Sequence, residues 1–91
     1  MQTYFVYIIE CSNGSFYTGY TTDPKRRYKE HVAGSAKCKY TRSFAPKRLA
    51  ACWEIGDNLS LALKIEKSIK KMTRSQKQLL IDSPNTLHTL Y

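Results

Sequence analysis

The sequence predicts a small α/β domain assembled from three strands and three helices. A run of β-branched and aromatic residues near the start of the chain predicts strands, and apolar residues at helical spacing in the second half predict helices. Hydrophobic residues make up 42% of the 91 residues, which is enough to fill a core and argues against disorder. A chain of this length has room for one domain, so we expect residues 1–91 to form a single unit whose core lies within residues 4–82.

The first two strands are expected to form a hairpin. Residues 4–9 are β-branched or aromatic on both alternating faces, which is typical of a buried central strand. Asn13 and Gly14 adopt positive φ angles readily, so the segment around them predicts a hairpin turn. Residues 16–21 then form the antiparallel partner, and Gly19 within it indicates a close approach to the backbone or a bulge.

The length of the hairpin loop decides which side chains of the two strands share a face. With a two-residue turn, Tyr17 lies opposite Glu10, and Tyr7 lies on the other face of the sheet. With a three-residue loop, or with a bulge near Gly19, Tyr7 and Tyr17 share one face. Tyrosines usually pack and hydrogen-bond within a core, but a shared face would indicate a functional site.

A helix is expected over residues 24–33. Asp23 suits the N-cap position, Pro24 suits the first helical position, and Gly34 ends the helix. Residues 34–47 then form a long basic segment, and loops of this length are often functional.

Arg27 and His31 are four residues apart, and they therefore lie on one face of this helix. They border a stripe of Tyr28 and Val32 that we expect to face the core. At such a border an arginine can bind a phosphate through two parallel hydrogen bonds, and a neutral histidine can accept a proton or orient water. The alternative is a surface arginine beside a half-buried histidine that serves only packing.

The second half of the chain predicts a third strand and two further helices. Residues 48–55 suit the strand, and residues 59–72 suit the longest helix, because apolar residues recur there at 3-4-3 spacing. Thr73 or Ser75 caps a short final helix, after which residues 83–91 are expected to fray.

Glu66 occupies an unusual place on the longest predicted helix. At 100° per residue it falls within the apolar arc formed by residues such as Ala62 and Ile69. An unpaired buried carboxylate is costly, so Glu66 requires an arginine, a lysine or a metal ion as its partner. Two alternatives follow: a buried ion pair with a base of the first helix, or the binding of Mg²⁺, which often takes only one or two protein carboxylates together with water and phosphate.

The formal charge of +8 is concentrated in two parts of the chain. All fifteen lysines and arginines lie within residues 25–48 and 64–77, and each of these segments contains a single acid. Such clustering is typical of proteins that bind a polyanion, although it also occurs on solubilising surfaces. The candidate nucleic-acid contacts are Lys25, Arg26, Lys37, Lys39, Tyr40, Arg42 and Lys70.

Other classes of protein are disfavoured by the composition. The longest apolar stretch has about six residues, against roughly 18 to 20 for a membrane span, and no signal peptide is evident. Neither basic segment has a large apolar face, so a membrane partner is not expected. Cys11, Cys38 and Cys52 are widely spaced and form no Cys-x-x-Cys pair, which favours reduced thiols and a cytoplasmic location over disulfides or a zinc site.

Together these residues resemble the GIY-YIG nuclease superfamily. That family places Gly-Ile-Tyr on one strand and Tyr-Ile-Gly on the next, and residues 5–7 (FVY) and 17–19 (YTG) stand at these motifs. Its following helix carries an arginine and often, four residues later, a histidine, which Arg27 and His31 match. Its metal-binding glutamate on a later helix is matched by Glu66. The resemblance covers nearly the whole chain and is closest to small single-domain bacterial members, whose function is poorly defined.

The resemblance implies a three-stranded antiparallel sheet flanked by helices and a metal-dependent hydrolysis of DNA phosphodiester bonds. Glu66 would hold one Mg²⁺ or Mn²⁺ ion, and Arg27 would bind the non-bridging phosphate oxygens. Tyr7, or alternatively His31, would position or deprotonate the attacking water. A phenol has an ordinary pKa near 10, so nearby cations would have to lower the pKa of Tyr7 for this role.

Two further residues take supporting roles by the same resemblance. Tyr17 would support the site through hydrogen bonding, and Gly19 would keep the backbone clear of the substrate. In the first motif Phe5 and Val6 replace the family's Gly-Ile, a change that we expect to be tolerated because the tyrosine carries the chemistry.

The expected function is a structure-selective DNA endonuclease of repair or recombination. Family nucleases usually carry a separate DNA-binding domain, so either the basic segment around Lys39, Tyr40 and Arg42 contacts the substrate or a partner protein supplies that domain. Lysine and arginine residues interleaved with aromatic residues suit branched, nicked or single-stranded DNA, where exposed nucleobases can stack on aromatic side chains. One alternative is a nucleic-acid-binding module without turnover. Another is an adaptor that docks on a protein through Phe44 and Trp53.

Overall fold

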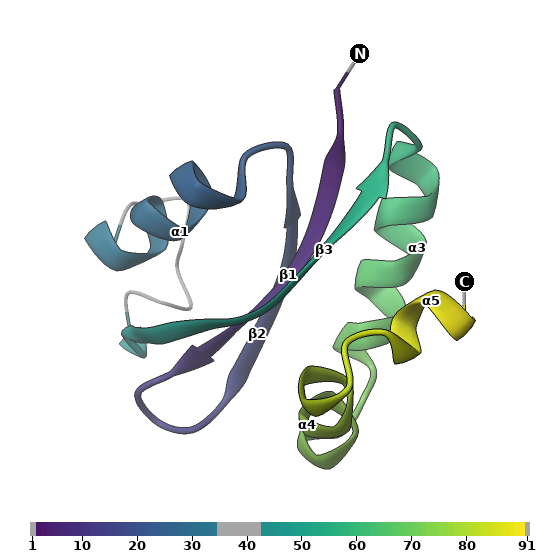
Figure 1. Ribbon diagram of the computed structural model, residues 1–91. Coiled ribbons are helices and arrows are strands. Elements are labelled where there is room, and N and C mark those ends of the chain that lie inside the picture. The colour runs from purple at the N-terminus through teal and green to yellow at the C-terminus, as the bar shows by residue number, and fades with distance from the viewer. Residues whose placement is uncertain (1, 35–42, 91) are drawn as a thin grey trace.

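Strand β1 (Tyr4–Cys11) is the centre of a three-stranded antiparallel sheet in a computed structural model of the chain, which describes residues 2–34 and 43–90 (Figure 1). It pairs with β2 (Phe16–Thr21) on one side and with β3 (Pro46–Gly56) on the other, so the strand order is β2-β1-β3. The predicted fold class is confirmed. The third strand begins two residues earlier than the sequence pattern indicated, and its pairing with β1 contains register shifts.

The hairpin between β1 and β2 has a three-residue loop. The backbone N–H of Cys11 donates to the carbonyl of Ser15 at 2.9 Å, and the N–H of Gly14 donates back to the carbonyl of Cys11 at 2.9 Å. Gly14 has a φ of +83°, which glycine adopts without the strain that a Cβ would cause. Tyr17 pairs with Ile9 as a result, and the second of the two alternatives for this loop is confirmed.

Helix α1 (Pro24–Ala33) begins and ends where the sequence predicts. The side chain of Asp23 accepts a hydrogen bond from the backbone N–H of Arg26 at 3.1 Å, and Gly34 ends the helix with a φ of +69°. The expected core-facing stripe was partly wrong, because Val32 is 59% exposed whereas His31 is 1% exposed. The histidine faces the sheet in place of the valine.

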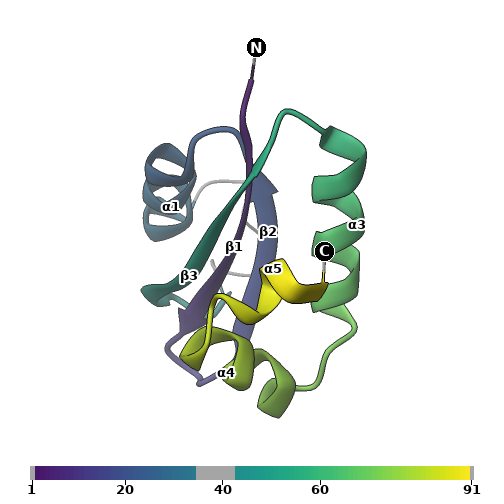
Figure 2. The same cartoon turned by 45° about the vertical axis from the view of Figure 1, so that its right-hand side comes forward.

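Helices α3 (Leu59–Lys70), α4 (Arg74–Asp82) and α5 (Thr86–Leu90) lie on the face of the sheet opposite α1, as the two views in Figures 1 and 2 agree. Val6 and Ile8 of β1 point to this face, because strand side chains alternate. They form the main core with buried residues of the three helices and of the other strands: Phe16, Trp53, Ala62, Ile65, Ile69, Leu80, Ile81 and Leu87. None of the described helices has the length and hydrophobicity of a membrane-spanning segment.

The C-terminal residues are ordered into helix α5, where the sequence predicted a frayed tail. Leu87 is buried in the main core, and the indole N–H of Trp53 donates to the carbonyl of Pro84 at 2.9 Å. Trp53 is buried by this packing and is unavailable as the surface contact that an adaptor function required.

Helix α4 contacts the β1–β2 hairpin through two basic side chains. Thr73 caps it, with Gln76 completing a reciprocal capping box, which confirms one of the two expected caps. Arg74 donates from Nε to the carbonyl of Gly14 at 2.8 Å and places its guanidinium 4.9 Å from the centre of the Phe16 ring. Lys77 donates to the carbonyl of Phe16 at 3.3 Å.

Candidate active site

The hydroxyl of Tyr7 forms the centre of a small polar cluster under α1. Its oxygen lies 3.0 Å from Nε2 of His31, and Nε of Arg27 donates to it over a longer distance of 3.4 Å. Tyr7 and His31 are both buried, and Arg27 is partly buried. Strand β1 supplies the tyrosine and α1 supplies the other two side chains, so the cluster joins the sheet to its covering helix.

His31 is held in its neutral form. Burial, followed by the nearby Arg27 guanidinium, lowers the pKa of His31 from 6.5 to about 4, while Glu30 acts in the opposite direction. A neutral imidazole has one N–H donor and one acceptor nitrogen. Because Arg27 already donates to the Tyr7 oxygen, all three groups are satisfied when the Tyr7 hydroxyl donates to an unprotonated Nε2 of His31.

Tyr17 stands beside this cluster on the same face of the sheet. Its ring centre lies 5.1 Å from that of His31 and 6.5 Å from that of Tyr7, in tilted and edge-to-face arrangements. Such arrangements are favourable for aromatic pairs. Both tyrosine rings therefore contact the imidazole from the sheet.

Gly19 pairs with Tyr7 across the two strands and leaves room for its ring. A Cβ at this position would lie 2.5 Å from the Tyr7 hydroxyl oxygen and 2.7 Å from Cζ, which is too close for any real contact. The sequence indicated a close approach here, and the approaching group is the Tyr7 side chain. The resemblance had implied a different reason for this glycine, namely clearance for the substrate.

Arg27 connects the buried cluster to an open hollow beside strand β2. Its Nη1 lies 3.0 Å from Oε1 of Glu30, which orients the guanidinium. The hollow has a volume of about 420 Å³ and presents hydroxyl groups and two guanidinium groups. It is lined by Tyr20, Thr21, Thr22, Arg26, Arg27 and Glu30.

The chemistry of this hollow suits a phosphate group. Guanidinium and hydroxyl groups donate hydrogen bonds to phosphate oxygens, and the partial burial of Arg27 strengthens its interaction with an anion. Sequence reasoning missed Glu30 as the partner of Arg27, although a spacing of three residues on a helix is a usable signal for such a pair. It also missed Tyr20 and Thr22, for which the only signal was their position directly after the second motif.

Glu66 lies outside the cluster around Tyr7. It belongs to α3, which packs on the opposite face of the sheet against β1 and β2. Its side chain is 12% exposed, as its place in the apolar arc indicated, and Oε1 lies 3.6 Å from Nζ of Lys70 on the same helix. Within the described residues no ion pair joins Glu66 to a base of α1, so that alternative for its partner is wrong there.

The surroundings of Glu66 form a second hollow, of about 420 Å³, whose described lining includes Lys64 and Lys67. In the described part of the chain no group of three or more His, Cys, Asp or Glu side chains could hold a metal ion by itself. A single carboxylate nevertheless fits an ion such as Mg²⁺ that shares its coordination with water and a substrate phosphate. Glu66 therefore suits a metal ion that is bound together with the substrate.

The remaining predicted contacts divide into two groups. Lys25, Arg26 and Lys70 are exposed, as phosphate-binding residues must be. Four others lie outside the described residues: Lys37, Lys39, Tyr40 and Arg42.

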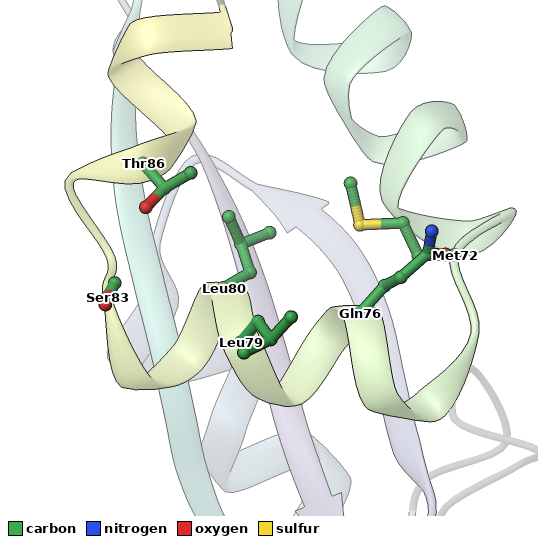
Figure 3. A pocket seen from close by; sticks show the side chains of 6 residues that line it. All are labelled: Met72, Gln76, Leu79, Leu80, Ser83 and Thr86. Carbon is green, nitrogen blue, oxygen red and sulfur yellow. The ribbon is translucent and has the colours of Figure 1, made fainter.

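A further hollow, of about 320 Å³, lies among α4, its neighbouring segments and Met72 (Figure 3). Its described lining is mainly apolar and contains no charged side chain: Met72, Gln76, Leu79, Leu80, Ser83 and Thr86. It borders the main core through Leu80, whereas Tyr7 belongs to the smaller cluster with Ile9 and Cys11. Its chemistry does not suit a phosphate.

The motif residues, their shared face and the helix that follows them define a GIY-YIG domain. The family model described as the GIY-YIG catalytic domain matches residues 3–79, and the chain therefore belongs to the GIY-YIG family. Members of this family are generally nucleases.

Relatives and solved structures support this membership across nearly the whole chain. A UPF0213 protein of Haloquadratum walsbyi is 49% identical over 79 residues, which are 87% of this chain and 86% of the relative. A UPF0213 protein of Syntrophus aciditrophicus is 42% identical over 88 residues, or 96% of this chain and all of the relative. The solution NMR structure of a UPF0213 protein from Bacillus halodurans has a TM-score of 0.56 and 40% identity, and the match covers 96% of this chain and 94% of that one.

Proposed function

We propose that this protein is a divalent-metal-dependent nuclease that hydrolyses phosphodiester bonds in DNA. The observation that carries the proposal is the Tyr7 hydroxyl, held between the guanidinium of Arg27 and a neutral His31. This arrangement offers a proton acceptor beside a phosphate-binding cation, which are the two groups that an attack of water on a phosphodiester requires. Family membership supports the same reaction class.

In the proposed mechanism Tyr7 takes a proton from the attacking water. The proton that Tyr7 already carries passes to Nε2 of His31, so the phenol does not have to be ionised before the substrate arrives. Arg27 stabilises negative charge on the Tyr7 oxygen during this transfer and on the phosphate oxygens as the transition state forms. Tyr17 limits the movement of the imidazole through its ring contact.

Glu66 would hold one Mg²⁺ or Mn²⁺ ion. The bound ion would stabilise the leaving oxygen and the charge on the phosphate. The Glu66 carboxylate would supply the protein ligand, and the ion would replace or accompany its present partner, Nζ of Lys70 at 3.6 Å. Strand β2 is an edge strand with α1 on one face and α3 on the other, so a substrate that crosses this edge has access to residues of both helices.

The proposed substrate is branched, nicked or single-stranded DNA. Exposed lysine and arginine side chains on α1 and α3, including Lys25, Arg26 and Lys70, can contact DNA phosphates, and such contacts carry no sequence information. We propose that residues 1–91 act as one domain in DNA repair or recombination within the cytoplasm, with a partner protein adding DNA-binding specificity. The free thiols of Cys11 and Cys52 support a reducing location.

The second candidate is a nucleic-acid-binding module without turnover. It is favoured by one observation, namely that Glu66 has no contact with the Tyr7 cluster among the described residues. This module would keep the phosphate-binding hollow at Arg27 and bind DNA with a steep dependence on salt.

Cleavage assays with matched variants separate the two candidates. Labelled duplex, single-stranded, nicked, flapped and four-way-junction DNA are incubated with wild type, Tyr7→Phe and Glu66→Gln in Mg²⁺ or Mn²⁺. The nuclease predicts metal-dependent products that fall by at least about a hundredfold in both variants, because each change removes one catalytic group and little volume.

The binding of each protein to the same DNA in EDTA provides the control. Both variants should bind with wild-type affinity, since neither loses a cation. Equal cleavage by all three proteins would contradict the assigned residues. Binding without products in any metal would favour the module.

A further inference from the structure

A hollow between α1 and β3 has a different character from the polar hollow at Arg27. Its volume is about 420 Å³, within the range of small-molecule sites, and its accessible lining is mainly apolar. Among the described residues it is lined by Pro24, Lys25, Tyr28, Lys29 and Leu49. We name this the α1–β3 groove.

The groove combines a flat apolar surface with positive charge. Tyr28, Pro24 and Leu49 supply ring and aliphatic surface, and the exposed Lys25 and Lys29 bring two ammonium groups. No described acid forms an ion pair with either lysine. The hollow therefore complements a ligand that has one flat apolar part and one anionic part.

An unpaired nucleotide has this combination. Bases stack on aromatic side chains irrespective of sequence, and lysines contact the phosphates on either side. We infer that the α1–β3 groove binds one unpaired nucleotide of the substrate, an inference that rests on the proposed function because it identifies the nucleic acid as containing a single-stranded segment.

The position of Tyr28 connects the groove to the candidate active site. Its ring packs against the small buried cluster of Tyr7, Ile9 and Cys11, and it also lines the groove. The next residue along the chain towards the N-terminus is Arg27, which lines the phosphate-binding hollow on the β2 side of the helix. A strand that crosses α1 can therefore place a nucleotide in the groove while a neighbouring phosphate lies at Arg27.

Nuclear magnetic resonance titrations test the groove without any need for cleavage. The ¹⁵N-labelled full chain is titrated in EDTA with the oligonucleotide (dT)₄ and, in a separate arm, with inorganic phosphate. We expect (dT)₄ to shift the amide signals of Lys25, Tyr28, Lys29 and Leu49 and phosphate alone to leave them unchanged. Equal shifts in both arms would overturn the inference, because they would show that only the anion is recognised.

Two leucines of equal exposure provide a matched pair of variants. Leu49 is 38% exposed and lines the groove, whereas Leu59 is 39% exposed at the start of α3 and lines none of the described hollows. Leu49→Glu should weaken (dT)₄ binding by about tenfold, and Leu59→Glu should leave it unchanged. Equal affinities for the two variants would overturn the inference.

A second variant, which removes charge from the groove, tests the inference even if Leu49→Glu fails to fold. Lys25→Ala combined with Lys29→Ala removes two exposed cations and should weaken (dT)₄ binding by a similar factor. The slope of log affinity against log salt concentration should fall in magnitude by about 1.4. If neither wild type nor any variant cleaves DNA while wild type still binds (dT)₄ in the groove, the proposed function alone is contradicted. Cleavage of unpaired DNA that is unaffected by the groove variants would contradict the groove alone.

Discussion

The Tyr7 hydroxyl lies 3.0 Å from Nε2 of His31, although 24 residues separate the two along the chain. Both side chains are buried, and the imidazole carries no positive charge at neutral pH because burial and Arg27 lower its pKa to about 4. The neutral imidazole can accept a hydrogen bond from the Tyr7 hydroxyl, and the proposed transfer of a proton to Nε2 also requires this form.

Stability should fall as the pH falls from about 6.5 to about 4. In this range the unfolded chain binds a proton at His31 and the folded protein does not, so the unfolded state is favoured progressively. The total loss attributable to His31 is about 3 kcal/mol, from about 1.4 kcal/mol for each pH unit between the two pKa values. Urea unfolding followed by Trp53 fluorescence at several pH values measures this slope.

The variant His31→Gln isolates the histidine from the carboxyl groups that also titrate in acid. It should lose stability less steeply over the same pH range, because its amide keeps an acceptor for Tyr7 and does not titrate. Identical slopes for wild type and variant would contradict the lowered pKa of His31.

Gly19→Ala should destabilise the protein by about 1–3 kcal/mol. The added Cβ would lie 2.5 Å from the Tyr7 oxygen, and the buried ring has little freedom to move aside. Displacement of the ring would also break its contacts with His31 and Arg27, so any nuclease activity should fall with stability.

A double-mutant cycle identifies the clash as the cause. In a Tyr7→Ala background the same glycine replacement should cost almost nothing, because the group that it meets has been removed. A cost that persists in this background would point to the backbone of β2 instead.

Leu87→Ala should cost about 2–5 kcal/mol of unfolding free energy. Leu87 is buried in the main core by α5, next to the segment in which Pro84 accepts a hydrogen bond from Trp53. Thermal unfolding of this variant and of Thr89→Ala, which alters an exposed side chain of the same helix, provides the comparison. Equal melting temperatures would show that α5 contributes nothing to the core.

Lys70→Ala should weaken DNA binding uniformly across sequences and reduce the salt slope by about 1. The change in stability should stay below about 1 kcal/mol, because the ion pair with Glu66 spans 3.6 Å and Lys70 is exposed. Anisotropy titrations at several salt concentrations measure the affinity and its salt slope, and urea unfolding measures the stability. Lys70→Arg keeps the charge and should keep the slope, and a slope unchanged in Lys70→Ala would place Lys70 outside the DNA interface.

Local patterns predicted much of the fold and some of the geometry around the candidate site. Capping by Asp23 and Gly34 fixed the limits of α1, since these interactions lie within a few residues of chain. For the hairpin the sequence left two loop lengths open, and the observed three-residue loop at Gly14 places Tyr7 and Tyr17 on one face, because side chains alternate along paired strands. Helical spacing likewise predicted the low exposure of Glu66.

The features that the sequence did not predict depend on contacts between distant segments. Helix α5 has only five residues and is too short to be stable alone, so its order depends on the burial of Leu87 against the core. His31 rather than Val32 is buried against the sheet because it forms a hydrogen bond with Tyr7. A hydrophobicity pattern carries no information about such a bond. The same holds for Trp53, which the packing of Pro84 covers.

Because the hairpin is attached to α4, its folding on the ribosome depends on residues that are synthesised much later. Arg74 and Lys77 contact Gly14 and Phe16 from 60 and 61 residues further along the chain. Synthesis proceeds from the N-terminus, and a hairpin on its own is only marginally stable. The nascent hairpin that carries both tyrosines therefore lacks its stabilising contacts until β3 and α4 have emerged from the exit tunnel. Its geometry is completed late in translation, so a truncated product released early would have the sequence motif without the assembled site.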